Sequence, residues 1–392
     1  DTGEEKIQMD SAPVKIDEPQ KNKDCLQPMY TADHYYGTLW LSKNPQLQWS
    51  ASLKCENDYS RSVMLASTVT SGDKVFCADS GGIIYAFDRR TGREIWRKST
   101  TLRGKDGQIG VAMACYGDKL VVSSSFAEAF LFDSKNGEIL WRIKLPAACT
   151  GDGITIYENK AFFVCGNSST QAVDLSSGRI LWSHSGMMTD TSMVGNTAAA
   201  ISNGVVYTAY PSGEVFALSE TGQELWSATL SKFSFVNAAK SFSHPRACPI
   251  VNEDLVYFTN ANRQISAIDI RTGEVVWKQN FGGVQTPAVS GNSIFVYDSE
   301  LQEIVCLNKK TGQKKWSQQM SPAGSDAFWF GPVLTSSGLL LVSSDGNLAL
   351  VSPFDGKLLS VNSLGDKVSV RPVVADGCLY LPVDSGNLVS YK

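Results

Sequence analysis

Seven copies of one short hairpin sequence constrain the fold of this 392-residue chain more than any other feature. Each copy has an apolar strand end, then an Asp, Asn or Ser, then a Gly, and all but the last have a Trp four residues after that Gly. The copies are 86–96, 131–141, 172–182, 217–226, 267–277, 306–316 and 350–360. A short polar side chain that bonds the turn backbone, followed by a Gly free to adopt positive φ, is typical of a tight turn between two strands. The sequence therefore predicts seven equivalent β-hairpins.

The spacing of these hairpins predicts how they assemble. They recur every 39 to 51 residues, and each interval holds two further apolar runs of strand length, for example 250–258 and 263–270. About four short antiparallel strands at such a period indicate a β-propeller, in which each blade covers its neighbour. The Trp lies on the outgoing fourth strand, where we expect its ring to pack against the next blade.

The two ends of the chain complete an eighth blade. Trp49 stands 47 residues before Trp96, one period away, and the C-terminus supplies only three strand-like runs, at 368–375, 379–383 and 387–391. Joining them removes the open sheet edges. We therefore predict an all-β, eight-bladed propeller of four-stranded antiparallel blades over residues 35–392, closed by an N-terminal strand. Residues 1–34 are acidic and polar without apolar periodicity, which predicts a flexible tail or tether.

Composition excludes several classes of function. The formal charge is −4, and residues 1–24 account for −3 of it, so the rest of the chain is nearly neutral. No run of Lys or Arg is longer than two residues, which argues against nucleic acid as a partner. No apolar stretch is long enough to span a membrane as a helix. Nine Cys without CxxC spacing argue against a zinc site or a full disulfide framework and favour small buried side chains, although a Cys25–Cys55 bridge stays open.

The pattern Ala-x-Asp-x-x-Thr-Gly-x-x-x-Trp, seen in full at 267–277, resembles the repeat of pyrroloquinoline-quinone-type propellers. Two families share this repeat: the quinoprotein dehydrogenases and the BamB family of the outer-membrane β-barrel assembly machinery. The dehydrogenases are usually far longer and resemble one another in a pair of adjacent Cys, which this sequence lacks. The blade count, the acidic tail, and the segments 267–278, 371–381 and 386–391 are closer to the BamB family.

The BamB resemblance implies a non-enzymatic periplasmic scaffold without a cofactor or a metal. It would bind the central barrel-inserting (BamA-like) subunit, support insertion of β-barrel proteins, and be tethered to the outer membrane by an N-terminal lipid anchor; unfolded outer-membrane proteins are a further candidate partner. Two alternatives stay open: a small quinone-dependent oxidoreductase, and a propeller adaptor with an unrelated partner.

Three connections between blades are longer or richer in aromatic residues and Met than a minimal blade requires: 187–195, 232–246 and 326–331. All precede a first, innermost strand, so they should open on one face of the disc, and such residues are typical of protein-binding surfaces. The BamB resemblance implies a partner contact made by two such loops, one with an apolar-Arg-Gly sequence and one with paired acids. In this sequence Val194 stands in place of the Arg, and His244 and Arg246 stand in place of the acids. The candidate partner-binding residues are Thr191, Met193, Val194, Phe233, Phe235, His244, Arg246 and Trp329. For the run 328–330, burial between blades or in the central channel is an equal alternative.

Catalytic residues are not indicated. Only three His are present, and exposure or edge packing is expected of His184. The repeated acids Asp88, Asp133, Asp174 and Asp269 are interpreted as turn residues rather than acid-base groups.

Overall fold

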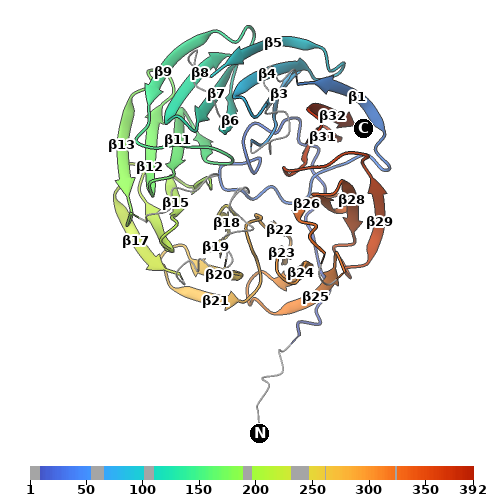
Figure 1. Cartoon of the computed structure of the whole chain (residues 1–392). Helices are drawn as coiled ribbons and strands as arrows, with labels where there is room; N and C mark the ends of the chain where they lie inside the picture. The colour runs from blue at the N-terminus through green and yellow to red at the C-terminus, as the bar shows by residue number, and fades with distance from the viewer. Residues whose placement is uncertain are drawn as a thin grey trace.

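The computed structural model describes residues 9–53, 66–100, 110–188, 197–230, 247–260, 262–322 and 325–392. Within these residues, 32 strands form eight separate four-stranded antiparallel sheets. Figure 1 shows the sheets as blades of a closed ring, with their fourth strands on the rim. The predicted eight-bladed propeller is confirmed. No helix among the described residues is long and apolar enough to cross a membrane.

Blades one to eight follow the chain. Blades one to three consist of β2 (Val69–Ser71), β3 (Lys74–Ala78), β4 (Ile83–Asp88) and β5 (Glu94–Ser99); β6 (Val111–Tyr116), β7 (Lys119–Ser124), β8 (Glu128–Asp133) and β9 (Ile139–Lys144); and β10 (Ile154–Tyr157), β11 (Lys160–Cys165), β12 (Ser169–Asp174) and β13 (Ile180–Ser185). Blades four to six consist of β14 (Ala200–Ser202), β15 (Val205–Ala209), β16 (Glu214–Leu218) and β17 (Glu224–Thr229); β18 (Ile250–Asn252), β19 (Leu255–Asn260), β20 (Gln264–Asp269) and β21 (Val275–Gln279); and β22 (Ala288–Ser290), β23 (Ser293–Asp298), β24 (Glu303–Asn308) and β25 (Lys314–Gln319). Blade seven consists of β26 (Trp329–Thr335), β27 (Gly338–Ser343), β28 (Asn347–Val351) and β29 (Leu358–Ser363), and blade eight of β30 (Val373–Ala375), β31 (Cys378–Val383), β32 (Asn387–Tyr391) and β1 (Leu47–Ser52).

The antiparallel order gives the disc two different faces. The turn between first and second strands and the turn between third and fourth strands lie at one end of each blade, which we call the turn-side face. The turn between second and third strands and the connection to the next blade lie at the other end, the loop-side face.

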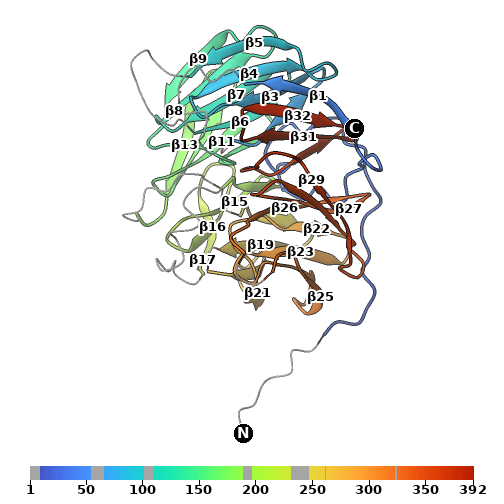
Figure 2. The ribbon, with the colours of Figure 1, turned by 45° about the vertical axis from the view of Figure 1, so that its right-hand side comes forward.

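Blade eight closes the ring as the sequence predicts. Strand β1 pairs antiparallel with β32, with Trp49 opposite Ser390 and Ala51 opposite Leu388. Figures 1 and 2 both place the C-terminus beside β1. The ring therefore has no free strand edge at the point where the two chain ends meet.

Each hairpin between third and fourth strands is built as the repeat predicts. In blade one, Asp88 Oδ1 accepts the backbone N–H groups of Arg90 (3.0 Å) and Thr91 (2.9 Å), and Gly92 has φ +74°. Donation by the Thr91 amide lowers the pKa of Asp88 below its usual value, because it favours the carboxylate. The interpretation of this acid as a turn residue is confirmed.

The repeated Trp docks on the hairpin of the next blade. In each of seven interfaces the indole N–H donates to a turn carbonyl at 2.7–3.0 Å, and the ring covers the turn Gly so closely that a Cβ there would lie 2.5–3.0 Å from it. The pairs are Trp49 on Gly92, Trp96 on Gly137, Trp141 on Gly178, Trp182 on Gly222, Trp226 on Gly273, Trp277 on Gly312 and Trp316 on Gly356. Two conditions therefore require Gly at this position: its φ is positive, and the Trp ring leaves no space for a Cβ.

This docking also explains why Ser360 replaces the eighth Trp. The next blade has no turn between its third and fourth strands, because β32 ends the chain and β1 comes from the other terminus. A Trp at 360 would have no hairpin Gly to cover.

Replacing Trp49 tests whether the docking closes the ring. Trp49→Ala should cost about 3–5 kcal/mol of unfolding free energy, since a buried ring and its hydrogen bond to the Arg89 carbonyl are both lost. Urea unfolding measures the cost. Leu47→Ala on the same strand, where Leu47 is 57% exposed, is the matched control and should cost far less. Equal costs would refute the role of the ring.

The N-terminal segment differs from the predicted flexible tail. Residues 9–34 pack against the propeller, and Val14, Cys25, Met29 and His34 are buried in it. Near its start, Asp10 forms an ion pair with Lys315 (2.8 Å) on the rim of blade six, and this hydrogen bond is the main reason that the pKa of Asp10 falls to about 2. Sequence composition is misleading here because the segment is held by backbone hydrogen bonds and isolated buried side chains rather than by a periodic apolar face. Cys25 has a free thiol, and Cys55 lies outside the described residues.

His34 makes the packing of this segment sensitive to pH. Its Nδ1 lies 2.6 Å from the carbonyl oxygen of Pro249, and burial, aided by the charge of Arg371, lowers its pKa from 6.5 to about 4. The folded protein therefore holds a neutral imidazole, and the stability that this confers is present above pH 6.5 and lost as the pH falls towards 4.

His34→Asn should remove this dependence. His34 has φ +63°, which Asn tolerates well, and an Asn amide can donate to the same carbonyl. Between about pH 7.5 and pH 4.5, the wild type should lose more unfolding free energy than the variant. Urea unfolding at the two pH values gives the difference, and equal losses would contradict the assignment.

Candidate functional site

The predicted partner-binding residues fall mostly outside the described residues. They are Thr191, Met193, Val194, Phe233, Phe235, His244 and Arg246, which lie in the stretches 189–196 and 231–246. The described residues that flank these stretches belong to connections between blades, and so to the loop-side face.

Trp329 is described, and it lies in the interior. It begins β26, is only 4% exposed, and donates its indole N–H to Ser321 Oγ at 2.8 Å. The neighbouring Phe328 packs edge-on against Tyr297 of blade six and against Phe330. Trp329 is therefore core between blades six and seven and Phe330 is core between blades seven and eight, and the Trp329 ring offers no exposed surface to a partner. The sequence signal was an excess of aromatic residues, which does not distinguish a buried strand start from a surface loop.

An apolar hollow lies on the loop-side face where blades four, five and six meet. Its lining includes Tyr210, Pro211, Leu230, Phe258 and Val284. Thr197 and Ala247 also line it, and each is the first described residue after one of the two predicted stretches. Sequence reasoning missed the hollow, because its lining comes from separate turns and connections of consecutive blades, none of which contains the hollow by itself.

Polar contacts hold the chain beside this hollow. His184 lies between Tyr210 Oη (2.9 Å from Nδ1) and Glu224 Oε1 (2.8 Å from Nε2), so its ring is buried rather than exposed. Glu214, another lining residue, accepts the backbone N–H of Met187 at 2.7 Å. The chain is thereby fixed up to the point where the first predicted stretch begins.

Two Met side chains protrude next to these contacts. Met187 is 61% exposed and Met188 is 83% exposed, within the run that the sequence singled out. Exposed Met beside an apolar hollow suits an adaptable protein-binding surface.

Among the described residues, no group of three or more His, Cys, Asp or Glu could hold a metal ion. Burial raises the pKa of several thiols to about 12, which keeps them protonated and poorly nucleophilic. These thiols belong to Cys25, Cys77, Cys165, Cys248 and Cys306.

Side chains of the chain itself span the centre of the ring. Arg371, which precedes the first strand of blade eight, reaches Asp152, which precedes the first strand of blade three (3.7 Å), so the pair links two blades that are not neighbours in the ring. Arg371 Nη1 also lies 3.2 Å from Met29 Sδ, and Asp152 accepts the Ser67 hydroxyl at 2.6 Å. Burial raises the pKa of Asp152, against the opposing influence of Arg371.

These features define the class: a closed eight-bladed propeller of Trp-docked, quinoprotein-type repeats whose axis is filled by its own residues. A family model described as outer membrane protein assembly factor BamB matches residues 80–318. The chain belongs to the BamB family.

A named relative agrees with this assignment, and two solved structures share the fold. The outer membrane protein assembly factor BamB of Yersinia pestis is 23% identical over 384 residues, covering 90% of this chain and 94% of that protein. The crystal structure of BamB from Moraxella catarrhalis is similar with a TM-score of 0.70 at 15% identity, covering 89% of this chain and 98% of that one. The quinohemoprotein alcohol dehydrogenase of Comamonas testosteroni is similar in fold, with a TM-score of 0.71 at 12% identity, covering 95% of this chain and 81% of that one.

Proposed function

We propose that the protein is a non-enzymatic scaffold of outer-membrane protein assembly that binds the central barrel-inserting subunit through its loop-side face. Membership of the BamB family supports a role in outer-membrane protein assembly, and one structural observation supports the loop-side face as the binding surface. The apolar hollow and the exposed Met187 and Met188 lie beside both stretches that carry the predicted contact residues. In this proposal the protein works in the periplasm, tethered to the outer membrane, with unfolded outer-membrane proteins as further ligands.

Charge distinguishes this contact from the one that the family resemblance implies. His244 and Arg246 stand where paired acids are expected, so the matching patch on the partner should be acidic. Raised salt should then weaken the complex, because exposed opposite charges are screened.

The alternative of a quinone-dependent oxidoreductase has less support. The sequence lacks adjacent Cys residues, and Asp152 is engaged by Arg371 at the centre of the ring. The likeness to a dehydrogenase is a likeness of fold. Incubation with quinone and calcium, followed by a dye-linked dehydrogenase assay, distinguishes the two functions, and dye reduction would favour the enzyme.

Capture of the barrel-inserting subunit's periplasmic domains tests the proposed face. Met193→Asp, Met188→Asp and Arg246→Glu should each weaken capture without lowering the melting temperature, and a true hot spot should lose about 2 kcal/mol or more. Arg90→Glu reverses an exposed charge on the turn-side face and is the matched control for Arg246→Glu.

Undiminished capture by Met193→Asp/Arg246→Glu, with the fold intact, would move the contact elsewhere. Equal weakening by Arg90→Glu would show a general effect of charge rather than a specific face.

A further inference from the structure

Residues 20–41, which we call the clasp, follow the inner edge of the ring. Each first strand lies at the edge of its sheet, so one edge faces the channel without a neighbouring strand. The clasp bonds the first strand, or the residue directly after it, in every blade. In blade order the contacts are Cys25 O to Thr70 N (2.8 Å), Leu26 O to Cys115 N (2.6 Å), Gln27 Oε1 to Ile156 N (2.8 Å), Ala32 O to Ile201 N (2.7 Å), Asp33 O to Val251 N (3.0 Å), Thr38 Oγ1 to Ser290 Oγ (2.9 Å), Leu39 O to Ser336 N (2.7 Å) and Asn22 O to Asp376 N (2.7 Å).

The path of the clasp is nearly circular. It meets blades one to seven in their order round the ring, and both of its ends reach blade eight, through Asn22 and through a bridge between Leu41 and Gly377. Figure 1 shows this blue segment crossing the middle of the ring. The clasp contacts each first strand near the end that leads into the turn to the second strand. The clasp therefore lies towards the turn-side face.

Many clasp side chains are buried, some of them between blades: Cys25 packs in the core of blades eight and one, and Leu39 and Leu41 pack in the core of blades seven and eight. Other buried clasp residues include Gln27, Met29, His34 and Thr38. Met29 packs with Ala198 and Cys248 of blades four and five, and its sulfur touches Arg371 of the central ion pair. The channel is therefore occupied by the protein's own chain, with the hydrogen-bonded clasp backbone at its turn-side end and Met29 reaching residues that precede first strands.

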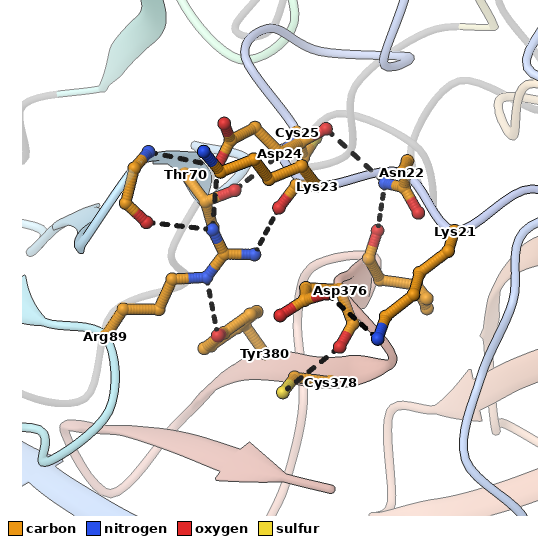
Figure 3. Close-up of polar contacts among 12 residues, drawn as sticks. Lys21, Asn22, Lys23, Asp24, Cys25, Thr70, Arg89, Asp376, Cys378 and Tyr380 are labelled. Atoms are coloured by element: carbon orange, nitrogen blue, oxygen red, sulfur yellow. Dashed lines mark hydrogen bonds and ion pairs between the residues drawn. The ribbon is translucent and has the colours of Figure 1, made fainter.

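The clasp also crosses the seam where the ring closes, as Figure 3 shows. Arg89 of blade one donates to Tyr380 of blade eight (2.9 Å), to Asp24 of the clasp (2.7 Å) and to the carbonyl of Lys23 (2.7 Å). The Arg89 carbonyl receives the indole N–H of Trp49. On the other side of the seam, Lys21 forms an ion pair with Asp376 at 3.5 Å.

We propose that the clasp is an intramolecular ligand of the central channel, which seals the turn-side end and locks blade eight to blade one, and which can open without unfolding of the blades. The inner strand edges that a partner's extended segment would bind are already filled. The loop-side face is then the face left for partners. This inference concerns the chain alone and does not rest on the proposed function.

Native thiols report clasp opening in the full chain. Cys25 belongs to the clasp, Cys248 lies beneath Met29, and Cys306 lies in the core between blades six and seven; all three are buried. Their alkylation rates with iodoacetamide, followed by mass spectrometry of the peptides, distinguish local opening from global unfolding.

Asp24→Ala/Gln27→Ala is the test variant. It removes the ion pair with Arg89 and both hydrogen bonds of the buried Gln27 amide to Ile156. Cys25 and Cys248 should react about tenfold faster or more, since buried polar partners are left unpaired, while Cys306 keeps its rate. Glu18→Ala/Gln20→Ala likewise removes one acidic side chain and one Gln, at exposed positions of the same segment, and should leave all three rates unchanged.

Two results would overturn the proposal. Unchanged rates at Cys25 and Cys248 would show that these contacts do not hold a seal, and equal acceleration of all three thiols would show that the clasp does not open separately from the blades. If the double variant does not fold, Gln27→Ala alone carries the same test with the same readout. Because no partner is present, neither result bears on the proposed function.

Discussion

The docking of a Trp ring on the turn Gly of the next blade is the interaction on which the rest of the structure depends. It joins blades through a hydrogen bond and a shape contact that leave no room for a Cβ. Seven repetitions of the same contact fix the same relation between neighbouring blades, which is what a closed ring requires. The contact is missing only after blade seven among the described interfaces, where the following hairpin is replaced by the two chain ends.

Most of the fold could be predicted because the residues of this interaction lie close together in the sequence and recur in every repeat. Gly92 and Trp96 belong to one hairpin, and their spacing recurs in each later copy, so strands, blade count and closure by Trp49 all follow. The clasp could not be predicted in this way. Its stability comes from hydrogen bonds to all eight blades, six of them made by the clasp backbone, and from single buried residues such as Met29, and neither leaves a pattern in the sequence.

The candidate site was only partly predictable, for a related reason. The run 187–195, which the sequence marked as an excess over the minimal blade, includes Met187 and Met188, and both are exposed. Trp329 gave the same signal and is buried, because aromatic content reports apolar surface without saying what covers it. The hollow beside Tyr210 and Phe258 arises from three blades together, so no single stretch of sequence contains it.

The two faces of the disc therefore have different roles in this account. The turn-side face holds the repeated hairpins and the clasp, and its inner strand edges are occupied. The loop-side face holds the hollow and the exposed Met residues, where the chain departs from its repeat. Such a departure from the repeat gives a surface that a partner can recognise specifically.

Hydrogen–deuterium exchange of the full chain, alone and with saturating periplasmic domains of the barrel-inserting subunit, tests this division most directly. Bound partner should slow exchange in the peptides 186–197 and 230–247, whose described ends lie on the loop-side face. The turn-side hairpins at 88–93 and 134–138 should exchange at the same rate with and without partner. Slowing confined to those hairpins, or no slowing on the loop-side face, would contradict it.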